Sequence, residues 1–148
     1  MSALILGRTD HKYLGYEFDW LAIDKHQNLG FFASSGEGWV PECVLESSSL
    51  FENTVELVIS WPAKSQTMLL SKAKADYFEW IEVARRGIYA FDWNCMTERY
   101  ELLVAPEAPL CLEDLADIRN DQLRKLFRLT SLDCRFDSEI DFPLYTDY

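Results

Sequence analysis

The sequence predicts an α+β domain with a mainly antiparallel sheet. Two aromatic-rich hairpin patterns, at 16–33 and 88–105, each consist of two apolar runs joined by a short polar turn. Helical apolar stripes lie between and after these patterns, and an alternating run near residue 134 predicts one more strand. We therefore expect two hairpins plus a C-terminal strand, packed with about three to four helices.

The length of 148 residues is enough for one domain with a sizeable core. We expect a single domain over 1–148, with 1–12 and 138–148 as loosely ordered ends. The first segment could also form a short edge strand. No internal repeat or low-complexity tract divides the chain.

The first hairpin is predicted by alternation with large rings on one side. The set predicted to face the core comprises Tyr16, Phe18, Trp20 and Ala22. The alternate set begins polar and ends apolar, and it comprises Glu17, Asp19, Leu21 and Ile23. The polar residues Lys25 to Asn28 make the turn, and Leu29 to Ala33 make the return strand.

A loop and a helix are expected next. Ser34 to Gly38 has the composition of a mobile loop, and Pro41 suits the first position of a helix that extends to about residue 59. The serines at 47–49 are poor helix formers, so a break is expected there as an alternative. Ala63 to Leu70 is either a linker or a short strand.

The second hairpin follows a helix. Apolar residues at helical spacing predict that helix, and Gly87 suits a left-handed cap after it; the stripe comprises Ala73, Tyr77, Trp80, Ile81 and Ala84. Ile88 to Trp93 and Tyr100 to Ala105 are the predicted strands, with a turn at Asn94 to Thr97.

The C-terminal third carries a helical stripe and an alternating run. The stripe predicts one helix over 112–129, or two with Asn120 capping the second, and it comprises Leu115, Ile118, Leu123, Leu126 and Phe127. Leu132, Cys134 and Phe136 alternate with polar residues and predict the last strand.

The net charge is −11. This charge argues against non-specific binding to nucleic acid or anionic lipid, and it favours a partner with a basic surface. Solubility alone is the competing explanation. The charge is unevenly spread along the chain. Residues 1–60 contain 3 basic and 9 acidic side chains, residues 61–100 contain 6 basic and 5 acidic, and residues 101–148 contain 5 basic and 11 acidic. If the two acidic ends meet in space, they form one negative face.

The cysteines predict neither a metal site nor a disulfide framework. Cys43, Cys95, Cys111 and Cys134 are widely separated, without zinc-ligand spacing. The sequence has no signal-peptide core and no run of transmembrane length. We expect four unpaired thiols in the core, a cytoplasmic location and no bound metal.

Catalytic arrangements are weakly represented. His11 and His26 are the only histidines and both lie in polar, turn-like stretches. Carboxylate pairs such as Asp19 with Asp24, or Asp92 with Glu98, occur by chance in an acidic chain. The 36–38 Gly-Glu-Gly loop lacks the rest of a phosphate-binding motif. Arg85 and Arg86 are interpreted as part of a solvated helix end. We expect no enzymatic activity and no cofactor.

Three stretches together resemble a family of bacterial immunity proteins of polymorphic toxin, contact-dependent and type VI secretion systems. They are DWLAID followed by LGFFASSGEGWVPE, then WIEVARRGIYAFDW, then YELLVAPEAPLCLEDL. The resemblance covers about residues 16–118, and its middle block is the most distinctive. It implies a small cytosolic protein without catalysis that binds one cognate toxin and blocks or deforms its active site. A nuclease is a candidate toxin.

Charge and loop position select nine candidate partner-binding residues. Glu37 and Trp39 come from the glycine loop, where the indole is either an exposed anchor or a cover for the hairpin. The full set is Asp19, Asp24, Glu37, Trp39, Glu42, Glu46, Asp92, Glu98 and Glu101. Two alternatives stay open: an acidic regulatory or scaffolding domain without a toxin partner, and a hydrolase that uses Asp92 and Glu98.

Overall fold

The computed structural model describes residues 3–4, 18–70, 77–117 and 121–137. They form an α+β fold, as predicted, with a six-stranded sheet ordered β1-β6-β5-β3-β2 and β4 also paired with β6. The strands are β1 (Ala3–Leu4), β2 (Asp19–Ile23), β3 (Leu29–Ala33), β4 (Thr67–Leu69), β5 (Tyr89–Asn94) and β6 (Arg99–Pro106). The helices are α1 (Glu42–Glu46), α2 (Thr54–Ile59), α3 (Phe78–Ala84) and α4 (Asp121–Arg128), with 3₁₀ helices at Ser48–Phe51 and Leu112–Asp117.

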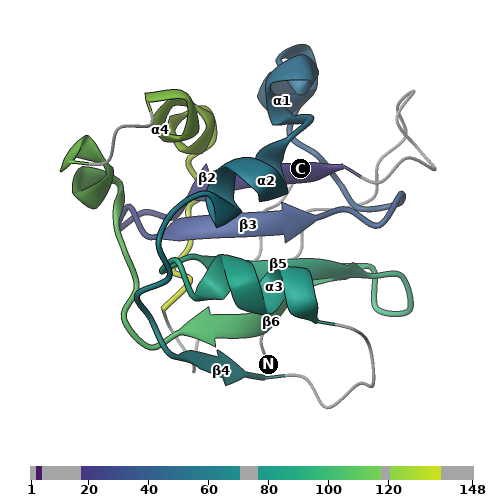
Figure 1. The fold of residues 1–148 in the computed structure, drawn as a ribbon. Coiled ribbons are helices and arrows are strands. Elements are labelled where there is room, and N and C mark those ends of the chain that lie inside the picture. Colours follow the sequence, from purple (N-terminus) through teal and green to yellow (C-terminus); the bar gives the residue numbers. More distant parts are fainter. Residues whose placement is uncertain (1–2, 5–17, 71–76, 118–120, 138–148) are drawn as a thin grey trace.

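Both predicted hairpins are present, as β2–β3 and β5–β6. A parallel pair joins them: β3 lies beside β5, with Gly30 opposite Tyr89 and Ala33 opposite Asp92. Neighbouring parallel strands run in the same direction and therefore finish at the same end of the sheet. The loop after β3 and the turn after β5 therefore leave the sheet at one end, seen at the right of Figure 1.

One face of the sheet carries a continuous aromatic core. Phe32 stacks between Trp20 and Phe91, at ring distances of 4.3 and 4.6 Å. Tyr100 packs edge-on against Phe32 and accepts a hydrogen bond of 3.1 Å from the Trp20 indole. Complete burial raises the pKa of the Tyr100 hydroxyl. Trp20 therefore faces the core as predicted, Phe18 is half-buried beside it, and Tyr16 lies outside the described residues.

The opposite face is covered by α2 and α3, which lie in front of the strands in Figure 1. The Trp80 indole of α3 donates to the Phe91 carbonyl at 3.2 Å. This carbonyl follows a bulge between Ala90 and Phe91, where the regular ladder of the sheet is interrupted. The bulge thus gives the helix a polar anchor on the sheet.

The helical segment after Pro41 is broken where the serines predicted a break. Pro41 precedes α1, and Ser47 leaves helical geometry with φ −114° before the 3₁₀ helix begins. The uncertain segment 63–70 contains the short strand β4. Gly87 has φ +87°, which confirms the left-handed cap. The residues predicted to begin the helix at Ala73 lie outside the described part, whereas α3 begins at Phe78.

The 112–129 stripe forms two helices, in agreement with the second of the two predicted arrangements. Asn120, the predicted cap, lies outside the described residues, as do 1–2, 5–12 and 138–148 of the predicted ends. Ala3 and Leu4 pair with β6, which matches the alternative of a short edge strand.

The prediction of a C-terminal strand is wrong. Leu132, Cys134 and Phe136 are buried as the alternation predicted, but with the described residues this segment makes a single isolated bridge, between Ser131 and Ile23. Its amides are used elsewhere: the Cys134 amide binds the Leu132 carbonyl, and the Phe136 amide binds a carboxylate of Asp24. Because these donors turn to local and side-chain acceptors, no ladder forms.

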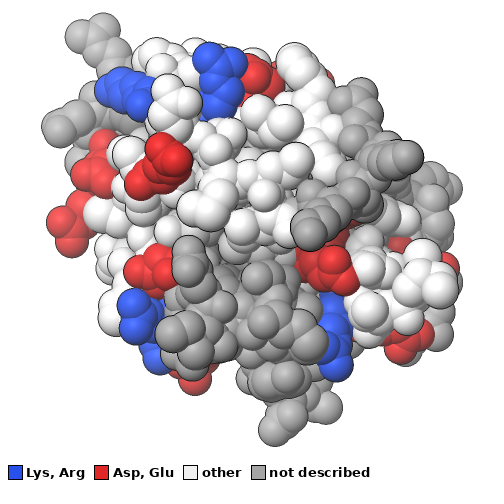
Figure 2. All heavy atoms as spheres, turned by 90° about the horizontal axis from the view of Figure 1, so that it is seen from below, with Lys and Arg blue, Asp and Glu red and all other residues white. Residues whose placement is uncertain are grey.

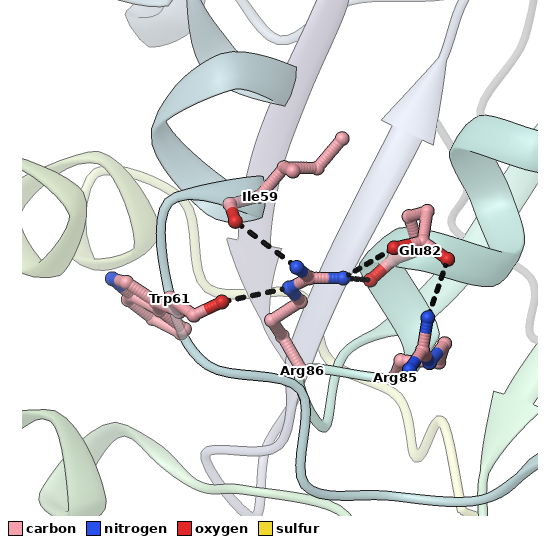
Figure 3. A network of polar contacts seen from close by, with 5 residues as sticks. All are labelled: Ile59, Trp61, Glu82, Arg85 and Arg86. Atoms are coloured by element: carbon pink, nitrogen blue, oxygen red, sulfur yellow. Dashed lines mark hydrogen bonds and ion pairs between the residues drawn. The ribbon is translucent and has the colours of Figure 1, made fainter.

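Arg86 is also not the solvated residue that the sequence predicted. Its guanidinium is buried and donates to the carbonyls of Trp61 and Ile59, each at 3.0 Å, and to the Glu82 carboxylate at 2.8 Å (Figure 3). Ile59 is the last residue of α2, so these carbonyls lack helical partners. Arg86 therefore ties the end of α2 to α3, whereas its neighbour Arg85 is exposed.

Candidate functional site: the acidic end of the sheet

Five of the nine candidate residues converge at one end of the sheet, which we call the acidic end. Three of them stand in a row across neighbouring strands: Asp19 is opposite Ala33, Ala33 is beside Asp92, and Asp92 is opposite Glu101. Residues that pair in this way project from the same face of a sheet. The acidic end comprises this row together with Glu37 and Glu98, from the loop after β3 and the turn after β5.

The loop that carries Glu37 is closed by hydrogen bonds. Both Glu37 and Gly38 donate their amides to the Ser34 carbonyl, at 3.2 and 2.8 Å. Ser35 and Gly36 take left-handed backbone angles, with φ 53° and 85°. The Glu37 side chain is exposed. The predicted glycine loop is thus a compact turn that presents a carboxylate at the end of the sheet.

The turn after β5 is held by Asn94. Its side-chain oxygen accepts the amides of Met96 and Thr97 at 2.8 and 3.3 Å, and its carbonyl accepts the amide of Glu98 at 2.8 Å. Glu98 is exposed with φ 56°, and the Met96 side chain is 88% exposed. This ordered tip offers one carboxylate and one thioether to solvent.

Neutral groups orient two of the carboxylates in the row. The Ser35 hydroxyl donates to Asp92 at 2.9 Å. Glu101 accepts from the Asn94 amide at 2.6 Å and from the Thr97 hydroxyl at 3.3 Å. Hydrogen bonds from neutral donors fix a carboxylate without cancelling its charge. Asp92 and Glu101 are therefore held in fixed orientations, half-buried and directly opposite each other.

A small recess opens beside the row. It has a volume of about 60 Å³ and is lined by Asp19, Phe31, Ala33, Ser35, Glu79 and Trp80. Sites for organic ligands enclose roughly 300 to 1,000 Å³. The recess is too small for such a ligand, and Glu98 is not among its lining residues. The acidic end is therefore better suited to surface contact with a macromolecule than to enclosure of a small substrate.

The remaining candidates differ from one another. Glu42 and Glu46 are exposed one turn apart on α1, which follows the glycine loop. The Trp39 ring is half-buried and packs edge-on against Trp20 at 6.4 Å. The interpretation of Trp39 as a cover for the hairpin is therefore confirmed, and only part of its ring faces solvent.

The prediction that Asp24 contacts a partner is wrong, because Asp24 is fully buried with 0% exposure. Its carboxylate accepts four hydrogen bonds, from the amides of His26 and Asn28 at 2.9 Å, the Asn28 side chain at 3.1 Å and the Phe136 amide at 2.7 Å. Asp24 lies at the other end of β2 from Asp19. The spacing of Asp24, His26 and Asn28 is typical of an Asx turn. This pattern could have predicted a structural role for Asp24, but Asp24 was chosen as a binding residue for its charge and loop position.

The described residues offer little for catalysis. Ser35 and Asp92 form a hydroxyl–carboxylate pair, but His26 is exposed in the turn at the opposite end of the sheet, and His11 lies outside the described part. No group of three or more metal-ligating side chains comes together among the described residues. The acidic end can therefore provide ion pairs and hydrogen-bond acceptors.

The cysteines depart from the expectation of four core thiols. All four are unpaired, but Cys43 and Cys95 are exposed, Cys111 is half-buried and only Cys134 is buried. Burial raises the pKa of the Cys134 thiol. Three of the four thiols are thus at or near the surface.

Comparison of the chain with protein-family models, with curated proteins and with solved structures finds no match. None of the described helices combines the length and the hydropathy that a membrane crossing requires.

Proposed function

We propose that this protein is a cytoplasmic immunity protein that binds a cognate antibacterial toxin through the acidic end and neutralises it. One observation supports the proposal above the others: carboxylates from β2, β5, β6 and two turns converge at one end of the sheet. A toxin that acts on nucleic acid needs a basic surface to hold phosphates. A rigid array of carboxylates can occupy that surface as a mimic of the polyanion.

The net charge of −11 adds to the local arrangement. A field of this sign accelerates association with a basic partner, while buried contacts at the centre of the interface set the lifetime of the complex. Met96, at the tip between β5 and β6, is an apolar side chain placed to make such a contact. In this mechanism the protein blocks the toxin by occupying its substrate surface.

The test is protection of a bacterium that expresses the toxin encoded beside this gene. The informative variant combines Glu37→Gln, Asp92→Asn and Glu101→Gln. Its matched control combines Glu107→Gln, Glu113→Gln and Asp133→Asn, three exposed residues in segments at the Asp24 end of the sheet, with the same change in net charge. We expect the control to protect fully and the acidic-end variant to lose protection.

Other outcomes separate the alternatives. Full toxin potency in the presence of the wild-type protein would contradict an immunity role. Equal protection by both variants would keep that role and remove the acidic end from the interface. If no toxin gene adjoins this one and a pull-down captures a different basic protein, the regulatory or scaffolding alternative takes its place.

A further inference from the structure

Among the described residues, β4 has a strand partner on only one of its two edges. Along β6, β1 pairs with Tyr100 and Glu101, and β4 pairs with Val104, Ala105 and Pro106. The Leu70 amide binds the Leu103 carbonyl and the Glu107 amide binds the Gln66 carbonyl, both at 2.8 Å. Along an antiparallel ladder, hydrogen-bonded residue pairs alternate with pairs that are not hydrogen-bonded. Met68 and Ala105 lie midway between the two hydrogen-bonded pairs and therefore form a hydrogen-bonded pair themselves. The amides and carbonyls of Thr67 and Leu69 therefore point away from β6.

These outward groups have no hydrogen-bond partner among the described residues. Within the described part of the chain, β4 pairs with β6 only, and no hydrogen bond involves the outward groups of Thr67 or Leu69. The side chains of the edge are uncharged and accessible, with Met68 41%, Leu69 51% and Leu70 40% exposed. From the side on which β4 lies, Figure 2 shows uncharged described residues in the upper and central part of the face, with a few charged side chains beside them.

The opposite edge of the sheet is treated differently. The Ile23 amide of β2 donates to the Thr130 carbonyl at 2.9 Å, and the Leu132 amide donates to the Ile23 carbonyl at 2.8 Å. Proteins usually protect an edge strand with such a cover, with charged side chains or with proline. None of these devices is found on Thr67–Leu69 among the described residues.

A cationic hollow adjoins the start of β4. It has a volume of about 270 Å³ and is lined by Ala63, Lys64, Ser65, Gln66, Thr67 and Arg85, with no carboxylate among them. The amides of Lys64 and Ser65 donate to the Arg85 carbonyl at 2.9 Å, which fixes the hollow against the end of α3. Lys64 forms no ion pair with a described residue, whereas Arg85 binds Glu82 at 2.9 Å.

We propose that β4 is a strand-addition site for an extended segment of a partner protein. The backbone of that segment pairs with Thr67 and Leu69, its apolar side chains cover Met68 and Leu69, and an Asp or Glu side chain at the end near Thr67 enters the hollow beside Lys64. Charge complementarity selects this occupant, because the hollow is positive in a protein of net charge −11. Backbone pairing supplies affinity and the side-chain positions supply specificity. This site is separate from the acidic end and does not depend on the proposed function.

The test is selection of displayed random peptides of about 10 residues on the full chain. We expect the enriched peptides to combine β-branched or aromatic residues with Asp or Glu, and to shift the amide resonances of Thr67 and Leu69 in NMR spectra. Leu69→Pro removes an outward amide and no bond to β6, so binding should weaken about tenfold or more. Lys64→Glu should weaken it similarly. Lys125→Glu, on the exposed surface of α4, is the control and should leave binding unchanged.

Two further measurements keep the test decisive. If Leu69→Pro lowers the melting temperature, Leu69→Lys replaces it, because this change charges the edge and leaves the backbone intact. Light scattering of the chain alone reports self-association. Peptides that bind Leu69→Pro as tightly as the wild type, or that bind both Leu69→Lys and Lys64→Glu as tightly, would overturn the proposal. A dimer abolished by Leu69→Lys would do the same by identifying a second copy as the occupant. Toxin protection, measured separately, does not depend on these outcomes.

Discussion

The two ends of the sheet use the same side chain in opposite ways. Asp19 begins β2 at the acidic end, in a row with Asp92 and Glu101, whereas Asp24 directly follows β2 and is fully buried under four N–H donors. At the Asp24 end the carboxylate organises the protein's own backbone. At the acidic end, Asp92 and Glu101 are oriented by side-chain donors and are only half-buried. The difference teaches that the surrounding donors, and not residue type, decide whether a carboxylate is enclosed by the fold or stays near the surface.

The largest effect is expected at Asp24. Asp24→Ala leaves three backbone amides without their acceptor and should lower the free energy of unfolding by about 3 to 5 kcal/mol. Glu37→Ala, at an exposed carboxylate of the acidic end, should change it by less than about 0.5 kcal/mol. Urea unfolding followed by tryptophan fluorescence measures both. Equal losses in the two variants would remove the distinction between the ends.

The arginine pair provides the same comparison for cations. Arg86→Met leaves the carbonyls of Ile59 and Trp61 without their donor and should cost about 2 to 4 kcal/mol of unfolding free energy. Arg85→Met, which alters an exposed pair with Glu82, should cost less than about 0.5 kcal/mol. Chemical denaturation again provides the measurement. A small loss for Arg86→Met would mean that water replaces the guanidinium at low cost.

At the acidic end, the effect should be on association and not on stability. The combined change Asp92→Asn and Glu101→Gln relieves repulsion between opposite residues, so unfolding free energy should shift by no more than about 0.5 kcal/mol. Association of the wild-type protein with its co-purified partner should slow as salt rises through the range where the screening length is about 8 Å. Stopped-flow rates should show a weaker salt dependence for the variant. A salt-independent wild-type rate would exclude electrostatic steering.

The smallest expected effect concerns Glu82. Hydrogen bonds from Arg86, and then from Arg85, lower the pKa of Glu82 from its usual value of 4.5. A carboxyl whose pKa is lower in the folded state contributes stability above its unfolded pKa and loses it as pH falls through the folded pKa. The stability difference between wild type and Glu82→Gln should therefore shrink as pH falls below about 4.5. A difference that stays constant across this range would show that ionisation of Glu82 is not coupled to folding.

Local pattern predicted much of the fold. The alternation around Trp20 and the polar turn after Asp24 specified the first hairpin, and β3 spans Leu29–Ala33 as predicted. Nothing local specifies that β3 lies parallel to β5, because that pairing joins segments separated by more than one helix. The sequence could therefore nominate Asp19, Asp92 and Glu101 individually, but not their alignment in a row.

The errors have the same origin. The buried face of the segment around Cys134 was predictable from alternation, but the capture of the Phe136 amide by Asp24, 112 residues away in sequence, was not. The prediction for Arg86 was wrong because its acceptors are carbonyls at the end of α2 and just after it. The residue types in a sequence do not show in which direction a carbonyl group points. Side chains whose partners are distant backbone groups are the ones that sequence pattern cannot place.

The bond between Asp24 and Phe136 also has a consequence for synthesis on the ribosome. The first hairpin is translated early, yet one of the donors to its buried carboxylate is added only 112 residues later. Until Phe136 is available, Asp24 is a charged group without its full set of partners, and the hairpin is only marginally stable. A chain released before that point lacks the closing contact of its own fold. The hydrogen bonding of the first hairpin is thus completed only after Phe136 has been translated.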